Sequence, residues 1–225
     1  MSSAQDAAKQ QAGRRAAEYV EDGMRVGLGT GSTVHFTILA LGERKPEITC
    51  AATSERTHDL AKSLGLAVLP PDEIGSLDIA IDGADEVDRD LNLVKGGGGA
   101  HLREKVVAAM AARFIVVVDE SKLVERLGAF GLPLEVLPFA PNVVAARVRS
   151  LGATSITTRD GQSDNGNLLM DADFGSIADP SGLSRDLASI PGLLEHGIFP
   201  AQMVERVVVA GADGTREIER PGLGG

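Results

Sequence analysis

The first half of the chain alternates between short apolar runs and segments in which apolar residues recur at helical spacing. The apolar runs, which predict strands, lie at residues 24–28, 48–52, 66–69, 77–81 and 114–118. The predicted helices lie at residues 33–41, 55–64 and 100–112. The last strand is an uninterrupted apolar run rich in β-branched residues, which is typical of a strand buried on both faces. Strands that alternate with helices predict a parallel sheet with helices on both faces.

The second half has a different order of elements, and the change is marked by Gly131 and Pro133. The predicted elements that follow are a strand at 134–139, a helix at 142–151, strands at 154–158 and 168–174, a helix at 181–190 and an extended segment at 194–199. This βαββαβ order is the split βαβ pattern. Residues 204–210 and 215–219 flank a glycine-containing turn at 211–214, so they predict a C-terminal hairpin.

The composition is that of a globular protein. The chain has 225 residues, of which 43% are hydrophobic and 24% charged, enough for one large domain or two small ones at ~100–200 residues each. The formal net charge of -10 disfavours nucleic acid and anionic membranes as partners. The longest apolar run, at 106–118, contains Arg113 and is shorter than the ~18 residues that a membrane-spanning helix needs.

The single cysteine, Cys50, excludes an internal disulfide and fits a reducing compartment. The first residues are polar and lack the apolar segment of a secretory signal. Both observations lead us to expect a cytoplasmic protein.

A glycine- and hydroxyl-rich segment, residues 27–33 (GLGTGST), lies between a predicted strand and a predicted helix. Ligands of open α/β sheets bind at such turns, and helix N-termini favour anions. The segment differs from the dinucleotide fingerprint because Ser32 occupies the third glycine position and no acid ends the second strand. It therefore suits a single phosphate group, although an ordinary strand–helix turn capped by hydroxyls remains the alternative.

Two carboxylates, Asp82 and Asp85, follow the fourth predicted strand and can point into one crevice. The alternatives are an Asx turn within a solvated acidic run, or a calcium loop, whose spacing this segment does not match. Downstream, residues 95–105 (KGGGGAHLREK) combine four glycines with Lys95, which can neutralise an oxyanion, and with Glu104 early in a helix. For Glu104 the alternative is a common helix N-terminal acid.

Other kinds of site find no support in the sequence. The four histidines, His35, His58, His101 and His196, are dispersed without metal-ligand spacing. No Gly-x-Ser-x-Gly nucleophile elbow is present, and Cys50 lies in a predicted buried strand, so covalent serine or cysteine catalysis is not indicated.

The motifs taken together, in their order along the chain, resemble the type A ribose-5-phosphate isomerases. The matching segments are 27–33, 52–57 (ATSERT), 82–86 (DGADE), 95–105, 119–122 (DESK), 132–136 (LPLEV), 164–167 (DNGN) and 190–199 (IPGLLEHGIF). The resemblance extends from about Ala7 to about Glu219, and its one local departure is Gly99, where alanine is also common. Each motif is weak alone, but the ordered set is specific.

The resemblance implies an α/β fold: a Rossmann-like parallel-sheet domain, at residues 1–129 and 203–225, with an inserted smaller α+β (ferredoxin-like) domain at 130–202. It implies an aldose–ketose isomerase that interconverts D-ribose 5-phosphate and D-ribulose 5-phosphate in the non-oxidative pentose phosphate pathway. It further implies a homo-oligomer, a dimer with a tetramer as the alternative, a phosphosugar as substrate, and no metal or organic cofactor.

Site residues are carried over by motif position. Glu104 matches the family's general base, Lys95 would stabilise the oxyanion, and Asp82 or Asp85 would move a proton among the sugar oxygens, with the choice between them open. Lys9 also matches a lysine common in the family. The substrate-binding residues implied are Thr30, Gly31, Ser32, Thr33, Asp82, Gly83, Ala84, Asp85, Lys95, Gly96, Gly97, Gly98 and Lys122.

Three other functions compete with this reading. An amino-sugar-phosphate deaminase or a CoA transferase can share the fold, but residues 95–105 fit the motif of neither. A non-catalytic sugar-phosphate sensor would need a DNA-binding module, for which there is no room before Val20 in an acidic chain. The presence of both Lys95 and Glu104 favours the isomerase.

Overall fold

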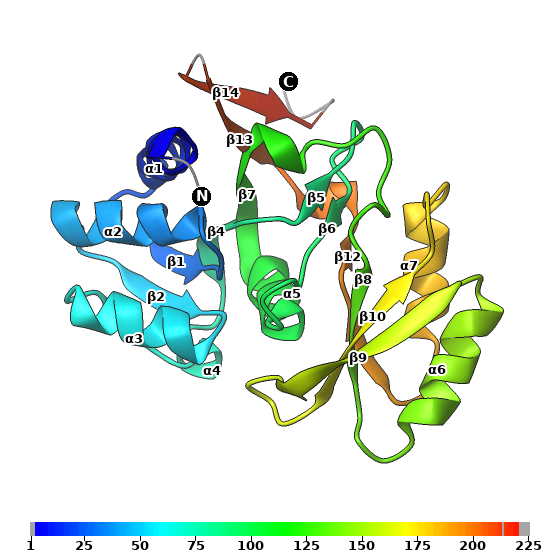
Figure 1. The fold of residues 1–225 in the computed structure, drawn as a ribbon. Coiled ribbons are helices and arrows are strands. Elements are labelled where there is room, and N and C mark those ends of the chain that lie inside the picture. Colours follow the sequence, from blue (N-terminus) through cyan, green and yellow to red (C-terminus); the bar gives the residue numbers. More distant parts are fainter. Residues whose placement is uncertain (1–2, 213, 221–225) are drawn as a thin grey trace. The chain divides into compact units, whose positions relative to one another are not determined.

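The computed structural model describes residues 3–212 and 214–220, and its contacts divide the chain into two units (Figure 1). The first unit, called here unit 1, combines Met1–Ala84, Arg103–Lys122 and Gln202–Gly225. The second, unit 2, combines Asp85–Leu102 and Leu123–Ala201. The chain therefore crosses from one unit to the other within the two motifs that carry the acidic and glycine-rich residues.

Unit 1 contains a seven-stranded sheet in the order β14-β13-β7-β4-β1-β2-β3. Its strands are β1 (Arg25–Leu28), β2 (Thr49–Ala52), β3 (Ala67–Val68), β4 (Leu77–Asp82), β7 (Ala111–Asp119), β13 (Arg206–Gly211) and β14 (Gly214–Glu219). All neighbouring strands are parallel except the β13–β14 hairpin, so the predicted parallel sheet and the predicted hairpin strands are confirmed. Residue 213, in the predicted hairpin turn, lies outside the described residues.

The strand order places a topological switch point between β1 and β4. From β1 the chain moves outward to β2 and β3, and it then returns to the other side of β1 to form β4. At such a point the loops that follow the two central strands diverge, and this opens a crevice at their carboxyl ends. The hydroxyl-rich loop follows β1 and Asp82 ends β4, so both belong to this crevice.

The helices of unit 1 are α1 (Ser3–Ala17), α2 (Val34–Arg44), α3 (Glu55–Ser63) and α4 (Pro71–Ile74). Helix α5 (His101–Met110) begins in unit 2 and continues into unit 1, where β7 follows without a connecting loop. Buried alanines of α1 and aliphatic side chains of α2 share one hydrophobic cluster with the central strands. Helix α1 approaches α2 so closely that a Cβ at Gly13 would lie 2.6 Å from Cβ of Phe36.

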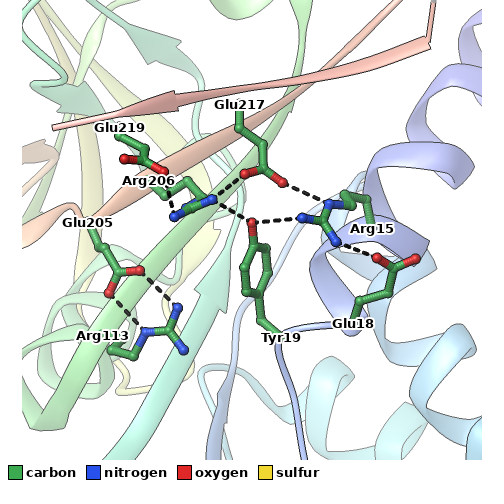
Figure 2. Close-up of polar contacts among 8 residues, drawn as sticks. All are labelled: Arg15, Glu18, Tyr19, Arg113, Glu205, Arg206, Glu217 and Glu219. Atoms are coloured by element: carbon green, nitrogen blue, oxygen red, sulfur yellow. Dashed lines mark hydrogen bonds and ion pairs between the residues drawn. The ribbon is translucent and has the colours of Figure 1, made fainter. Parts of the chain in front are cut away.

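A polar cluster around Tyr19 connects the end of α1 with the C-terminal hairpin (Figure 2). The Tyr19 hydroxyl accepts hydrogen bonds from Arg206 Nη1 at 2.9 Å and from Arg15 Nη2 at 3.3 Å, and both arginines also pair with Glu217. The guanidinium carbons of Arg15, Arg206 and Arg113 lie 5.0, 5.2 and 5.6 Å from the tyrosine ring centroid. The hairpin is thus attached to the N-terminal helix by charge as well as by packing.

Unit 2 contains a four-stranded antiparallel sheet in the order β11-β8-β10-β9, covered by two helices. Its elements are β8 (Leu132–Val136), α6 (Pro141–Ser150), β9 (Ser155–Gln162), β10 (Leu168–Asp173), α7 (Pro180–Ala188) and β11 (Leu193–His196). This arrangement confirms the predicted ferredoxin-like fold. The predicted strand at 134–139 is shifted: β8 begins at Leu132 and ends at Val136.

A second, three-stranded sheet of unit 2 has the order β12-β6-β5. It consists of β5 (Glu86–Val87), β6 (Leu93–Val94) and β12 (Ile198–Phe199), and short 3₁₀ helices η1 (Glu120–Lys122) and η2 (Ala201–Met203) follow β7 and β12. The buried carboxylate of Glu86 accepts hydrogen bonds from the backbone N–H groups of Gly128 and Phe130 at 2.7 and 2.6 Å. Through this contact the segment after η1 joins unit 2.

The units differ from the predicted domain boundaries in three places. Residues 85–102 and 123–129 are predicted in the Rossmann-like domain, whereas their contacts group them with the four-stranded sheet, and Gln202, predicted in the inserted domain, groups with unit 1. The domain boundaries stay a prediction. Among the described residues, no helix has the length and hydropathy that crossing a membrane requires.

Candidate active site

The loop between β1 and α2 is held directly against the carboxylate of Asp82. The backbone N–H of Thr30 donates to Asp82 Oδ1 at 3.0 Å, and the N–H of Gly83 donates to the same oxygen at 2.7 Å. A Cβ at Gly29 would lie 2.1 Å from the Asp82 carboxyl carbon, so only glycine allows this approach. Asp82 is 3% exposed, which shields these hydrogen bonds from water. The structure thus brings Thr30 and Asp82 together.

Four hydroxyl groups connect this loop to the start of α3. Thr30 Oγ1 lies 2.8, 2.7 and 2.9 Å from the side-chain oxygens of Thr53, Ser54 and Thr57. Thr57 also donates to the carbonyl of Gly29 at 2.9 Å. The Thr30 hydroxyl is therefore engaged within the protein. The exposed Ser32 is then the hydroxyl of this loop that is open to a ligand, since Thr33 is buried.

A buried lysine, Lys9 of α1, lies next to the same loop. Its Nζ is 3.1 Å from Ser32 Oγ and 3.7 Å from Asp119 Oδ2, and the side chains of Lys9 and Asp119 are 6% and 7% exposed. Lys122, predicted to contact substrate, is half-buried in η1, three residues after Asp119. A cation beside a loop that ends at a helix N-terminus suits a phosphate group.

A cavity of about 320 Å³ opens beside the loop within unit 1. Its lining residues are Gly29, Gly31, Ser32, Val34, His35, Ile38, Arg56, Thr57 and Leu60. The exposed Arg56 adds a positive charge at its border. Arg56 belongs to the motif at residues 52–57, but its place beside the loop is visible only in the structure.

Glu104 is a buried carboxylate, 4% exposed, in the first turn of α5. Because α5 leads directly into β7, its N-terminal end lies at the carboxyl edge of the unit 1 sheet. Two contacts support this placement of α5. Arg103 Nη1 is 2.9 Å from Glu55 Oε1 at the start of α3. A Cβ at Gly27 of β1 would lie 2.5 Å from Val107. Glu104 is three residues before Val107 and so shares its face of the helix. Glu104 therefore lies at the same edge of the sheet as the β1–α2 loop.

The glycine-rich loop, residues 95–99, belongs to unit 2. The N–H of Lys95 donates to the carbonyl of Gly197 at 2.8 Å, and Lys95 Nζ lies 5.4 Å from the ring centroid of Phe199. Lys95 is 2% exposed. The N–H of Gly97 donates to Asp85 Oδ2 at 2.7 Å. Within unit 2 the structure therefore brings Asp85 together with the loop.

The predicted site residues thus fall into two groups by unit. Unit 1 holds Thr30, Gly31, Ser32, Thr33, Asp82, Gly83, Ala84, Glu104 and Lys122, and unit 2 holds Asp85, Lys95, Gly96, Gly97 and Gly98. Within the described residues there is no cluster of three His, Cys, Asp or Glu side chains that could hold a metal ion.

Residues 49–214 match the family model of ribose 5-phosphate isomerase A, also called phosphoriboisomerase A. The chain belongs to this family. It is 47% identical over 223 residues to the ribose-5-phosphate isomerase A of Thermomicrobium roseum, an alignment that covers 95% of this chain and 94% of that protein. The family assignment confirms the resemblance seen in the motifs.

Two solved structures of phosphoriboisomerases are similar in fold. The ribose 5-phosphate isomerase A of Neisseria gonorrhoeae aligns with a TM-score of 0.93 and 35% identity, and covers 96% of this chain and 97% of its own. A D-ribose-5-phosphate isomerase in complex with phospho-erythronic acid aligns with a TM-score of 0.91 and 37% identity, covering 95% and 98%. Both comparisons extend over nearly the whole chain and confirm the predicted α/β fold class.

Proposed function

We propose that this phosphoriboisomerase interconverts D-ribose 5-phosphate and D-ribulose 5-phosphate through a cis-enediolate, with Glu104 as the general base. The family supplies the reaction, since its members are ribose-5-phosphate isomerases. The observation that carries the base assignment is a carboxylate that is 4% exposed and lies at the edge of the sheet that bears the β1–α2 loop.

The proton transfer requires one base that acts twice. Glu104 takes the proton from C2 of the open-chain aldose, and the electron pair moves onto the carbonyl oxygen to give the enediolate. The protonated Glu104 then returns the proton to C1, while the C2 oxygen becomes the ketone. A positioned base of this kind contributes ~10²–10⁴-fold in rate.

The developing oxyanion needs donors that are already in place. We assign this role to Lys95 and to the N–H groups of Gly96, Gly97 and Gly98, following the family motif. Because preorganised donors need no rearrangement as charge develops, such groups make a large contribution to catalysis.

A second acid–base group must move protons among the sugar oxygens and open the ring. Asp82 and Asp85 are the candidates. Asp82 accepts two backbone hydrogen bonds from its own unit, and Asp85 accepts one from the glycine loop. Kinetics of Asp82→Asn and Asp85→Asn would identify which of the two aspartates moves these protons.

The phosphate end of the substrate is assigned to the β1–α2 loop with Lys9 and Lys122. The protein's net charge is -10, so its overall field repels a sugar phosphate, and capture depends on these local donors and cations. Binding at the phosphate then provides positioning energy at a distance from the reacting carbons.

Activity on the two sugars tests this assignment. We expect ribulose 5-phosphate to form from ribose 5-phosphate with a chelator present, and a kcat/KM for free ribose at least ~10³-fold lower because the phosphate supplies the binding energy. Similar constants for the two sugars would contradict the phosphate assignment. Substrate binding without ketose formation would favour a sensor, and loss of activity with chelator would require a metal site at residues 82–90.

We also propose a cytoplasmic homo-oligomer, on the family resemblance and the single cysteine. A dimer is the expected state. Size-exclusion chromatography with light scattering, and an activity assay of the eluted fractions, measures the mass of the active species. A fully active species with the mass of one chain, 23.4 kDa, would contradict the proposal.

A further inference from the structure

We propose that Arg159, held by Asp171, is a positioning residue that orients the peptide groups of the glycine loop for oxyanion stabilisation. This proposal rests on the proposed function, which assigns the loop's N–H groups to the enediolate. Arg159 and Asp171 come from β9 and β10 of the four-stranded sheet, more than sixty residues after the loop. All the residues involved belong to unit 2.

The three nitrogens of the Arg159 guanidinium donate hydrogen bonds to two partners, the Asp171 carboxylate and the backbone of the glycine loop. Nε and Nη2 donate to the two carboxylate oxygens of Asp171 at 2.7 and 2.5 Å. Nη1 donates to the carbonyl of Gly96 at 2.8 Å and lies 3.2 Å from the carbonyl of Gly97. The carboxylate thereby fixes the plane of the guanidinium, and the remaining nitrogen fixes two consecutive peptide carbonyls.

Peptide geometry transmits this orientation to the N–H groups. The described chain has no cis peptide bond, so each C=O points opposite to the N–H of the same peptide. With the carbonyls of Gly96 and Gly97 held toward Arg159, the N–H groups of Gly97 and Gly98 point away from it. The Gly97 N–H follows this direction and donates to Asp85 Oδ2 at 2.7 Å, so it holds Asp85, and the oxyanion donor that Arg159 orients is the N–H of Gly98. Both Gly97 and Gly98 are exposed.

The contact also changes the strength of these donors. A charged donor on a carbonyl polarises its peptide and makes the N–H at the other end a better donor to an anion. Glycines would otherwise sample many conformations, and Gly96, at φ 110°, is in a region that other residues avoid. Arg159 therefore orders and polarises the peptide groups of Gly96 and Gly97, which have no side chains of their own.

The competing interpretation is a cross-strand ion pair that only stabilises the β9–β10 hairpin. It predicts that loss of Arg159 lowers the melting temperature without changing the turnover of the folded enzyme. The positioning role predicts instead a selective loss of affinity for an enediolate-like carboxylate. Lysine distinguishes the two further, because a point charge can pair with Asp171 but cannot also hold both carbonyls.

The experiment compares Arg159→Gln, Arg159→Lys and Asp171→Asn with Arg149→Gln, an exposed arginine of α6 in the same unit. The readouts are kcat and KM for ribose 5-phosphate, and calorimetric affinities for phospho-erythronic acid and for inorganic phosphate. For Arg159→Gln we expect kcat and phospho-erythronic acid affinity to fall together by ~10-fold or more, with KM and phosphate affinity within about twofold. For Arg159→Lys and Asp171→Asn, kcat and phospho-erythronic acid affinity should lie between those of Arg159→Gln and the parent. Both values for Arg149→Gln should match the parent.

Chemical rescue by free guanidinium tests whether the missing guanidinium group itself causes the loss of activity. Millimolar guanidinium should partly restore kcat of Arg159→Ala, whereas the same concentration of sodium chloride should not. Unchanged kcat and phospho-erythronic acid affinity in Arg159→Gln would overturn the proposal, as would activity lost only in proportion to unfolded protein. If Glu104→Gln kept full turnover, the base assignment would fail, while the phospho-erythronic acid affinities would still decide the role of Arg159.

Discussion

Gly29 determines how closely the β1–α2 loop can approach Asp82. A methyl group at this position would lie 2.1 Å from the Asp82 carboxyl carbon, so either the loop or the carboxylate would have to move. Gly131, outside the proposed site, makes a matched control, because a Cβ there would meet only Cβ of Asp171 at 3.5 Å, an ordinary contact distance. The two glycines separate crowding of the site from loss of a glycine in general.

We expect Gly29→Ala to lower kcat/KM for ribose 5-phosphate by about 10²-fold, since displacements of ~1 Å near reacting groups have effects of this size. Gly131→Ala should stay within a few-fold of the parent. Steady-state kinetics with a thermal melt of each variant measures both effects. Equal activity of the two variants would show that the contact between Gly29 and Asp82 has no role in the reaction.

At this scale the sequence predicts residues that belong to a contiguous motif. Thr30, Asp82 and Glu104 could be named because each follows a predicted strand or loop in a characteristic order. Arg159 could not be named, because its partners are far away in the chain and it is a single arginine in an unremarkable segment. Arg56 belongs to the matching segment 52–57, but only the structure shows that it lines the cavity beside the β1–α2 loop. Such roles arise from tertiary contacts alone.

At the scale of elements, an ion pair next to the Tyr19 cluster joins β7 to Glu205, the residue before β13 (Figure 2). Arg113 donates from Nε and Nη2 to the two carboxylate oxygens of Glu205, both at 2.9 Å. These hydrogen bonds hold the pKa of Glu205 below its ordinary value, while partial burial opposes the shift and the positive charge of Arg113 adds to it. The pair therefore makes folding stability depend on pH.

We expect Glu205→Gln to lower Tm by ~2 °C at pH 7, a small effect because the pair is partly exposed. A carboxylate whose pKa is lowered by folding stabilises the protein above its ordinary pKa of ~4.3 and loses that effect as pH falls below it. The difference in Tm should therefore shrink as pH is lowered below this value toward pH 3. Glu73→Gln, on exposed α4, is the control. A constant difference from pH 7 to pH 3 would contradict the assignment.

Hydrophobic periodicity predicts the longer elements and misses the shortest ones. Most strands of the seven-stranded sheet could be predicted because they are buried apolar runs, whereas the polar β14 was predicted from the glycine-containing turn that precedes it. Strands β5 and β6 have two residues each, which is too short for any period to show. The predicted extended segment at 194–199 is confirmed as two strands, β11 and the two-residue β12. Helix α1 had no predicted bounds, because its exposed side is polar and its buried side consists largely of alanine.

At the scale of the whole molecule, the fold follows from the order of its elements, and the family then links that order to one reaction. The parallel sheet and the βαββαβ unit could each be predicted from local patterns. The division into units at Ala84 and Leu102 could not, because residues 85–102 join unit 2 through pairings with distant residues such as Gly197. Such boundaries depend on contacts between residues that are distant in the chain, and a local sequence pattern does not show these contacts.

The central claim is that this chain moves a proton between two carbons of a sugar phosphate through Glu104. Its most direct test is Glu104→Gln, which keeps the shape of the side chain and removes the base, compared with Glu73→Gln. In deuterated solvent, kcat and the exchange of the substrate C2 proton are measured together. The account predicts that kcat falls at least ~10²-fold, that KM changes little and that exchange is lost, with the control unaffected. Near-normal turnover and exchange in Glu104→Gln would contradict it and direct the search for the base to Asp82 and Asp85.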